Sequence, residues 1–312
     1  MSEALGDSIQ KVCVTGGAGF IGSRVVQGLL ERDIDVLVLD NLSVGRRENV
    51  PAPAVLLEAD IQDPAVAGDI AACDAVIHMA ARVAIRSSFE FVVEDTSTNV
   101  VGTANILRCA TAEGSRVRKF ILASSMAVYA DSEQAVAITE EYPVLPVSPY
   151  GVSKLAAEML VRQMCHEKGI DSATLRLFNT YGTGQALSPY VGVVTIFANA
   201  MREGRAPTIF GDGEQRRDFV HVEDVAQGFL KALQHHTQGA VFNIGSGSGL
   251  TVNQVYQEIA LALGFDQAPI YAAAVPGELR NSIAETTKAA GQMGFSPKRT
   301  FAGSIAGILK GI

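Results

Sequence analysis

The residues of this chain best suited to chemistry are a tyrosine and a lysine in the segment YGVSK (150–154). On a helix this spacing places Tyr150 and Lys154 on one face. A lysine ammonium beside a tyrosine favours the phenolate, and a cationic cofactor nearby would add to that effect. The phenolate could then accept a proton from an alcohol while a hydride leaves its carbon. The pair alone is common by chance, so its meaning depends on what lies near it.

Two serines close the apolar segment KFILASS (119–125), which we expect to be a buried strand. Ligands of open α/β sheets bind beyond the carboxyl ends of the strands. Ser125 is therefore placed to share the reacting hydroxyl with Tyr150 and to orient its proton. Ser124 is expected to support the loop. The alternative is a structural serine pair that satisfies backbone groups at the strand end.

A glycine-rich turn, TGGAGFIG (15–22), follows the first apolar segment and opens a helical pattern. Its glycines suit a tight turn at Gly16, close approach of a pyrophosphate at Gly19, and helix-on-strand packing at Gly22. The helix N-terminus would offer free N–H groups to the phosphates. We therefore predict a dinucleotide site that includes Gly16, Gly19, Phe20, Ile21 and Gly22. A purely structural turn is the alternative.

The choice of dinucleotide depends on Asp40, which ends the second apolar segment, DVLVLD (35–40). A carboxylate there can accept both ribose hydroxyls and would repel a 2′-phosphate, so we predict NAD rather than NADP. Arg46 and Arg47 are a mild contrary signal. We interpret His78, in HMAA (78–81), as a structural histidine. Further cofactor contacts are expected at Asn41, Asp60, Ile61, Ala80 and Ala81.

Short apolar segments alternate with helical patterns through the first half of the chain. The expected strands cover 11–16, 35–40, 54–60, 75–80, 119–125 and 172–179, and the expected helices cover 20–31, 98–112 and 150–168. Strands that are apolar throughout and separated by helices predict a parallel sheet covered on both faces, in a Rossmann-type doubly wound α/β fold. We predict a dinucleotide-binding domain over 1–178 and a smaller α/β substrate domain over 179–312. Part of about 219–246 could rejoin the first sheet.

The composition of the chain limits the kinds of partner that it can bind. The chain has 312 residues and a formal net charge of −8 without a basic block, which argues against nucleic acid and anionic membranes. No segment approaches the roughly 18 apolar residues of a membrane span, and the first ten residues lack the pattern of a signal peptide. The four cysteines form no C-x-x-C pair. We expect buried, reduced thiols, a cytoplasmic protein and no metal site.

The motifs together resemble the extended short-chain dehydrogenase/reductases, and within them the NAD-dependent nucleotide-sugar epimerase/dehydratase family, with UDP-galactose 4-epimerase the most similar type. The resemblance runs nearly from end to end. It is carried by TGGAGFIG (15–22), HMAA (78–81), NVVGT (99–103), SSMAVY (124–129), YGVSK (150–154), RLFNTYG (176–182), FGDGEQRRDFVHVEDVA (210–226) and VPGELRNSIAETTKA (275–289).

The resemblance implies further roles. Asn99 would contact the cofactor, Asn179 the nucleotide diphosphate, and Arg217 a phosphate, while Arg280 would make a second phosphate or hydroxyl contact. Ser282 would occupy the gate position beside the C2 substituent of the sugar, where a small residue leaves room for an N-acetyl group. The helices near 98–112 and 150–168 would pair with those of a second copy in a homodimer. For Arg217 and Arg280, a surface ion pair is the alternative, and for Ser282 a solvent-facing position.

The residues after Ser125 distinguish between reactions. Related dehydratases carry acidic residues where this chain has Met126 and Ala127, which can neither donate nor accept a proton. We therefore predict a 4-epimerase that acts on UDP-glucose and UDP-galactose, and on the N-acetylated pair, through a transient 4-keto sugar. A 4-ketoreductase, a dehydratase and a cofactor-binding regulator remain as alternatives. Gly184 stands where the family has an arginine, which makes a carboxylated sugar a poorer fit. Val275 replaces a second family arginine, in the part that concerns the nucleotide. We assume that this nucleotide is uridine.

Overall fold

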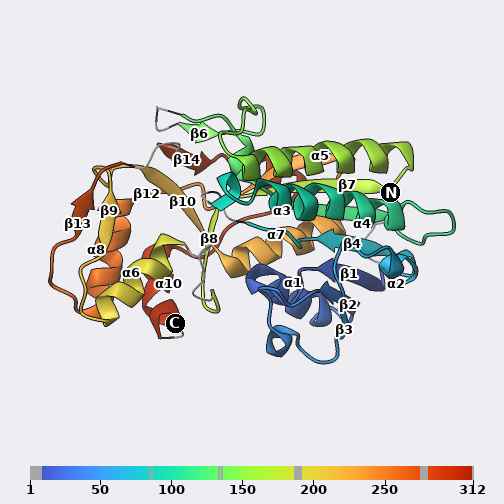
Figure 1. The fold of residues 1–312 in the computed structure, drawn as a ribbon, viewed down its shortest axis with the longest axis horizontal. Helices are drawn as coiled ribbons and strands as arrows, with labels where there is room; N and C mark the ends of the chain where they lie inside the picture. Colours follow the sequence, from blue (N-terminus) through green and yellow to red (C-terminus); the bar gives the residue numbers. More distant parts are fainter. Residues whose placement is uncertain are drawn as a thin grey trace.

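The computed structural model describes residues 9–310 except 84, 86, 133, 135, 186–191 and 275–279. The larger of its two lobes contains a seven-stranded parallel sheet (Figure 1). In spatial order its strands are β11 (Ala240–Ile244), β7 (Asp171–Leu177), β5 (Lys119–Ser125), β4 (Ala75–His78), β1 (Lys11–Thr15), β2 (Asp35–Asp40) and β3 (Val55–Glu58). This order confirms the predicted doubly wound fold. It reverses at β1, which has β2 on one side and β4 on the other, and such a switch point is where ligands bind in this fold class.

The strands are apolar on both faces because helices cover both faces. On β1, Val12 and Val14 join the core beneath one pair of helices, whereas Cys13 joins the core beneath the others. The first face is covered by α1 (Phe20–Leu30) and α7 (Val222–Gln234). The second face is covered by α2 (Ala67–Ala71), α4 (Thr103–Ala110) and α5 (Pro149–Glu167). The four cysteines are free and buried, as predicted.

The helix expected over 98–112 begins earlier than predicted. It starts as α3 (Val92–Thr96), continues through a π-helical segment at Ser97–Gly102, and ends as α4. A π-helical turn inserts one residue into the helical register, which apolar periodicity does not reveal. Short 3₁₀ turns lie at Arg47–Asn49, Pro64–Val66, Ser87–Phe89 and Met126–Val128. None of the helices in the described part of the chain is long and apolar enough to cross a bilayer.

The smaller lobe is built from short strands and three packed helices. The helices are α6 (Val193–Arg202), α8 (Val252–Leu263) and α10 (Phe301–Leu309), which share a third core with Phe219. A mixed sheet joins β12 (Gly249–Thr251), β10 (Arg216–His221), β14 (Asn281–Ala284), β6 (Ala137–Ile138) and β8 (Asn179–Tyr181), and β13 (Ile270–Ala272) pairs with β9 (Thr208–Phe210). A further helix, α9 (Thr287–Met293), follows β14.

The chain returns to the large sheet through α7 and β11. Strand β11 pairs with β7, whereas residues 219–221, at the start of the range of which part could rejoin the sheet, belong to β10 in the second sheet. The predicted domain boundary near residue 178 stays a prediction.

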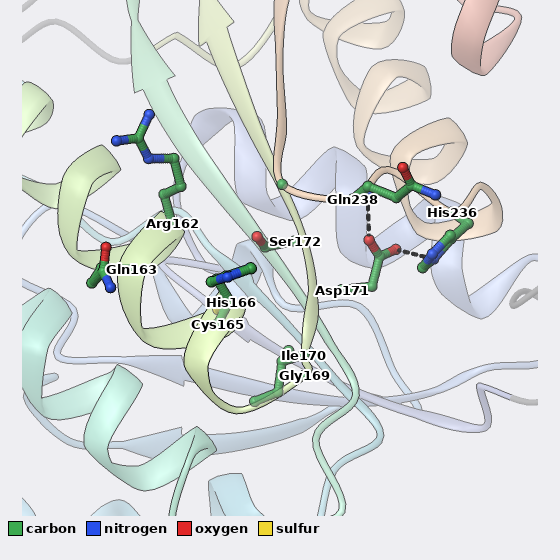
Figure 2. Close-up of a pocket in the computed structure, with 11 residues that line it drawn as sticks. Arg162, Gln163, Cys165, His166, Gly169, Ile170, Asp171, Ser172, His236 and Gln238 are labelled. Atoms are coloured by element: carbon green, nitrogen blue, oxygen red, sulfur yellow. Dashed lines mark hydrogen bonds and ion pairs between the residues drawn. The ribbon is translucent and has the colours of Figure 1, made fainter.

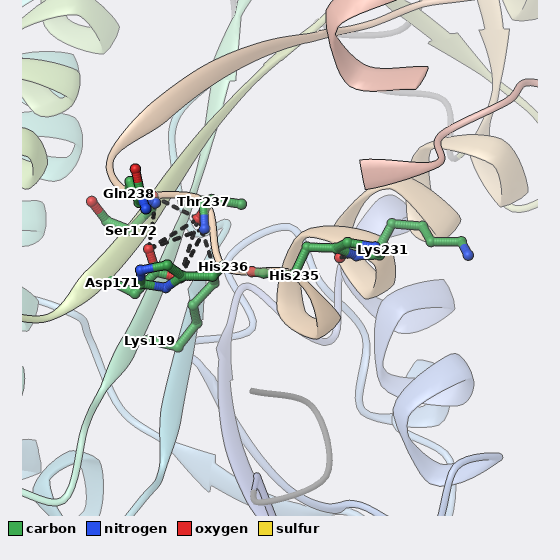
Figure 3. A network of polar contacts seen from close by, with 8 residues as sticks. All are labelled: Lys119, Asp171, Ser172, Lys231, His235, His236, Thr237 and Gln238. Atoms are coloured by element: carbon green, nitrogen blue, oxygen red, sulfur yellow. Dashed lines mark hydrogen bonds and ion pairs between the residues drawn. The ribbon is translucent and has the colours of Figure 1, made fainter. Parts of the chain in front are cut away.

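A buried ion pair fixes the returning segment at the amino-terminal edge of the sheet (Figure 3). Lys119 Nζ lies 2.5 Å from Asp171 Oδ2 and also donates to His235 O and Thr237 Oγ1. Asp171 accepts from the backbone N–H groups of Thr237 and Gln238. Burial lowers the pKa of Lys119, against the opposing effect of Asp171. For Asp171, burial favours the neutral carboxyl, but the bond and charge of Lys119 together with the backbone N–H groups of Thr237 and Gln238 lower its pKa overall.

Beside this pair lies a cavity of about 470 Å³ between the end of α5 and the segment before β11 (Figure 2). Asp171 borders it and is also contacted by His236 Nδ1 at 3.2 Å. Because parallel strands begin at this edge, the cavity lies at the opposite end of the sheet from the strand ends where ligands bind.

Replacing Lys119 with methionine should lower the free energy of unfolding by about 3–5 kcal/mol, because Asp171 would stay buried without its cation. Urea denaturation at fixed cofactor concentration measures this change. The matched control is Lys119→Met with Asp171→Asn, which removes both charges and should cost less than the single change. A double variant less stable than Lys119→Met would contradict the ion-pair argument.

Candidate active site

A cavity of about 1790 Å³ lies at the carboxyl ends of the large sheet. Its lining includes the loops after β1, β2, β3 and β4 and the ends of β5 and β7. The smaller lobe contributes residues of α6, β9 and β10. The cavity therefore spans the switch point of the sheet and both lobes, and its volume exceeds the usual 300–1,000 Å³ of a small-molecule site.

The glycine turn is shaped as a dinucleotide would require. Gly16 has φ +70°, and a Cβ there would lie 2.8 Å from Ala80 N. A Cβ on Gly22 would lie 2.1 Å from Gly16 O. At Gly19 the nearest atom would be 3.2 Å away, so the protein itself leaves more room there, as close approach of a phosphate requires. No side chain caps α1, and Phe20 and Ile21 line the cavity at its first turn. The turn therefore fits a pyrophosphate.

Asp40 ends β2 at the cavity wall, as predicted from the sequence. Its Oδ2 accepts from Ala18 N at 3.0 Å and its Oδ1 from Leu42 N at 2.9 Å, so the carboxylate also fixes the glycine loop. A carboxylate has about four acceptor sites, which leaves capacity for a ribose diol. Of the two arginines that we noted as a signal for NADP, Arg47 pairs with Glu58. Arg46 lines the cavity but is mostly exposed.

The other predicted cofactor residues divide into two groups. Asn41, Asp60, Ile61, Ala80 and Ala81 line the cavity. Asn99 is not among the described lining residues. Its amide is engaged with the backbone N–H and C=O of Arg82 and with Ser153 Oγ at 2.8–3.0 Å. Asn99 therefore holds the loop after β4 and does not present a free amide to a ligand.

His78 is structural, as we interpreted it. Its Nδ1 lies 2.7 Å from Thr15 Oγ1 and its Nε2 lies 2.9 Å from Thr103 Oγ1. Because Thr103 Oγ1 donates to Asn99 O, it accepts from His78, which places the ring proton on Nε2. Burial, with the nearby Lys154 charge, lowers the pKa of His78 to about 3, so the ring is neutral.

Ser125, Tyr150 and Lys154 meet at the cavity, as the spacing predicted. Helix α5 begins with Pro149, and Ser148 Oγ caps it by accepting from Gly151 N at 3.1 Å. This start places Tyr150 in the first turn, facing the end of β5. Ser125 Oγ accepts from Ala127 N at 3.2 Å, so its own proton is available to the Tyr150 hydroxyl.

Burial controls the ionisation of the tyrosine and the lysine. Tyr150 is 6% exposed, and burial raises its pKa to about 12 against the opposing hydrogen bond from Ser125, while the Asp95 charge raises it further. Lys154 is 4% exposed, and burial lowers its pKa to about 8 against the opposing charge of Glu158. In the protein alone, burial therefore outweighs the expected effect of the lysine, and Tyr150 stays protonated at neutral pH.

The sequence analysis missed a buried network behind these residues. Glu158 Oε1 accepts from Ser124 Oγ at 2.5 Å, and both of its oxygens accept from Arg176 at 3.0 and 2.7 Å. Arg176 in turn lies 4.6 Å from the Tyr129 ring centre. The available signal was the position of Glu158, one helical turn beyond Lys154. Ser124 therefore bonds to a residue of α5, whereas we expected it to support the loop after β5.

Of the residues predicted to bind the substrate, some line the cavity and others do not. Asn179 and Arg217 line the cavity, and Asn179 Nδ2 is buried without a hydrogen-bond partner among the described residues. Arg280 lies elsewhere: its guanidinium makes two bonds of 2.8 and 2.9 Å to Asp212. Here the surface ion pair that we kept as the alternative is what the structure shows. Arg280 O, however, accepts from Arg217 Nη1 at 3.3 Å.

The structure contradicts the solvent-facing alternative for Ser282, whereas its role as the gate residue stays a prediction. Ser282 is fully buried rather than solvent-facing, its Oγ has no partner in the described part of the chain, and it pairs in register with Arg217. It is not among the described lining residues of the cavity. Of the two arginine replacements, Gly184 lines the cavity, whereas Val275 lies outside the described residues.

Comparisons with known proteins agree with this geometry. Residues 12–245 match the model of the NAD dependent epimerase/dehydratase family. A putative UDP-glucose 4-epimerase of Methanocaldococcus jannaschii is 37% identical over 92% of this chain and 93% of its own length. A UDP-glucose 4-epimerase of Thermotoga maritima, solved with UDP-glucose, superposes with a TM-score of 0.92 at 35% identity, covering 96% of this chain and 98% of that one. A UDP-N-acetylglucosamine 4-epimerase of Methanobrevibacter ruminantium, solved with UDP-N-acetylmuramic acid, gives 0.91 at 29% identity, covering 97% of each chain.

Replacing Asp40 with alanine should weaken NAD binding by about 10- to 100-fold, the loss expected for a charge-assisted hydrogen bond, and should weaken NADP binding less. Calorimetric titration of cofactor-free protein with each dinucleotide measures both affinities. Asp40→Asn is the matched control, because it can keep the bond to Ala18 N while losing the charge. Equal losses for NAD and NADP in the alanine variant would contradict the assignment.

Proposed function

Because the chain belongs to the NAD dependent epimerase/dehydratase family, we propose that it catalyses the 4-epimerisation of a nucleotide-diphosphate sugar, with UDP-glucose and UDP-galactose as its substrate pair. The resemblance read from the motifs is thereby confirmed. The observation that carries the proposal is that Ser125, Tyr150 and Lys154 face one cavity whose adjoining residues, Met126 and Ala127, cannot ionise.

Ser125, Tyr150 and Lys154 have separate roles in the proposed reaction. When bound, NAD would be held by the glycine turn and Asp40 and would supply a reversible hydride acceptor for C4 of the sugar. The charges of Lys154 and of the cationic nicotinamide would favour the phenolate form of Tyr150, whose Oη then takes the proton of the 4-hydroxyl, since hydride loss from an alcohol requires loss of that proton. Ser125 Oγ donates a hydrogen bond that holds the 4-oxygen beside Tyr150. The Lys154 ammonium lies one helical turn away, where its charge stabilises the phenolate as the proton is transferred.

The same residues argue against the alternative reactions. A dehydratase needs an acid and a base at the carbons beyond C4, and the positions next to Ser125 are occupied by buried Met126 and Ala127. A ketoreductase would use the same three residues but release its cofactor at each turnover. The relatives named as UDP-glucose 4-epimerases, which align over nearly the whole chain, favour the epimerase.

The nucleotide diphosphate is assigned to Asn179 and Arg217. The buried, unpartnered Asn179 Nδ2 is a donor that an acceptor from a ligand would satisfy. Arg217 lines the cavity from β10, and a guanidinium suits phosphate oxygens. Because Arg280 is engaged with Asp212, it is left out of the diphosphate site. Its backbone oxygen instead contacts the Arg217 side chain and helps to orient it.

We also infer a homodimer formed through the outer faces of α3, α4 and α5. Met159 is 60% exposed, and Val101 and Val152 are likewise exposed. Val152 and Met159 lie seven residues apart on α5, hence on one face of the helix. Such apolar side chains on adjacent helices suit burial against a second copy. The free, buried cysteines suit a reducing compartment and support a cytoplasmic location.

Replacing Tyr150 with phenylalanine should slow turnover by about 10²- to 10⁴-fold, because the proton acceptor is lost, while NAD remains bound. The rate is measured by NMR of the C4 configuration of UDP-glucose and UDP-galactose, and bound NAD by release after denaturation. Tyr271→Phe, in exposed β13 of the smaller lobe, is the matched control and should turn over normally. Turnover by Tyr150→Phe near the wild-type rate would refute the mechanism.

Enlarging the gate residue tests the predicted range of sugars. We expect wild type to accept UDP-N-acetylglucosamine, and Ser282→Tyr to lose this activity selectively, because added volume near Arg217 obstructs the larger C2 substituent. The readout is the ratio of kcat/KM for acetamido sugars to that for plain hexoses, which does not depend on the fraction of folded protein. Ser282→Ala keeps the volume small and should leave the ratio unchanged. An unchanged ratio in the tyrosine variant would show that the gate assignment is wrong.

A further inference from the structure

Glu158 is a buried acid that the proposed mechanism does not use. It is 6% exposed and lies four residues after Lys154, on the same face of α5. A buried carboxylate is unfavourable unless it is paired and hydrogen-bonded. Glu158 has a forked ion pair with Arg176 and a short bond from Ser124, so two buried side chains stabilise its charge behind the active site.

The partners of Glu158 lie on two neighbouring strands. Ser124 of β5 and Arg176 of β7 face each other in register, and Ser125 pairs with Leu177 in the next position. Successive side chains on a strand point to opposite faces, so Ser124 points towards α5 while Ser125 reaches the cavity. By binding Ser124 and Arg176 together, Glu158 fixes the ends of both strands against the helix that carries Tyr150 and Lys154.

Glu158 is also the acid nearest in sequence to Lys154. Burial lowers the pKa of Lys154 to about 8, and the charge of Glu158 raises it against that effect. The neutral His78 ring on β4 feels the Lys154 charge, Asp95 on α3 acts on the neighbouring Tyr150, and Arg176 on β7 already bonds to Glu158. Without the charge of Glu158, burial would act on Lys154 unopposed, and burial favours the neutral lysine.

We propose that Glu158 is a positioning residue that keeps Lys154 charged and holds Ser125 in line with Tyr150, by binding the end of β5 to α5 through Ser124. The proposal rests on the proposed function. It predicts that activity depends on Glu158 most strongly at alkaline pH, because the neutral form of Lys154 then competes with the charged one. A merely structural role would lower activity equally at all pH values.

The test is Glu158→Gln, which keeps the shape of the side chain and removes its charge. We expect the alkaline limb of the kcat profile to move to lower pH by about one unit, so that the loss of activity at pH 9 exceeds the loss at pH 6.5 by several-fold. Glu167→Gln, at the exposed end of the same helix, is the matched control and should leave the profile unchanged. An unmoved alkaline limb in Glu158→Gln would overturn the proposal.

Two further measurements separate this proposal from the proposed function. Competitive acetylation of Lys154 across pH, read by peptide mass spectrometry on cofactor-free protein, needs no activity, and its midpoint should fall in Glu158→Gln. Ser124→Ala leaves the Glu158–Arg176 pair intact and should lower kcat by about three- to ten-fold with an unmoved alkaline limb. An unchanged acetylation midpoint, or wild-type kcat in Ser124→Ala, would overturn the proposal. Absence of epimerase activity in wild type with a shifted midpoint would instead overturn the proposed function alone.

Discussion

Helices cover both faces of the large parallel sheet, so a polar side chain on a central strand can meet a ligand only where the strand ends. This constraint places Asp40 and Ser125, the last residues of β2 and β5, at the same cavity. It also explains why polar side chains inside the sheet need partners from neighbouring elements. His78 is held between two threonines, and Arg176 is held by Glu158. A buried polar group without such partners would destabilise the fold by about 1–3 kcal/mol.

The parts of the site that the sequence predicts are those whose function depends on a local element. The glycine turn, Asp40 and the Tyr150–Lys154 pair each need only one strand end or one helical turn, and their spacing is visible in the chain. Glu158 was missed because its role depends on Ser124 and Arg176 being opposite each other on β5 and β7. Cross-strand register of this kind cannot be read from apolar periodicity, which describes each strand separately.

Contacts between residues far apart in the chain also explain why Arg280 and Asn99 have partners within the protein that we did not expect. Asp212 lies 68 residues before Arg280 in the chain, and the two meet because β10 and β14 are neighbours. Asn99, within the π-helical segment, likewise meets the backbone of Arg82, 17 residues before it in the chain. A resemblance transfers residue types reliably, but it does not show which partner within this chain has already engaged them.

The segment RRDFVHVED shows how structural and ligand-facing residues can share one motif. Arg217 lines the cavity, whereas its neighbour Asp218 is fully buried and accepts from the N–H groups of Ser246, Gly247 and Ala284. Asp224, at the start of α7, accepts from the backbone of Lys298 and Arg299. Asp218 fixes the strand that carries Arg217 to the segments beside it, and Asp224 connects α7 to residues 298–299, so the motif contains acids with a structural role beside an arginine that faces the cavity.

The late return of β11 to the large sheet has a consequence for synthesis on the ribosome. Strand β7 is complete at Leu177, but its outer edge stays unpaired until Ile244 has emerged and β11 can add to it. During that interval the nascent chain exposes an unpaired strand edge, which is the kind of surface that recruits other strands. Translation through the intervening segment therefore sets how long the growing chain needs protection by chaperones.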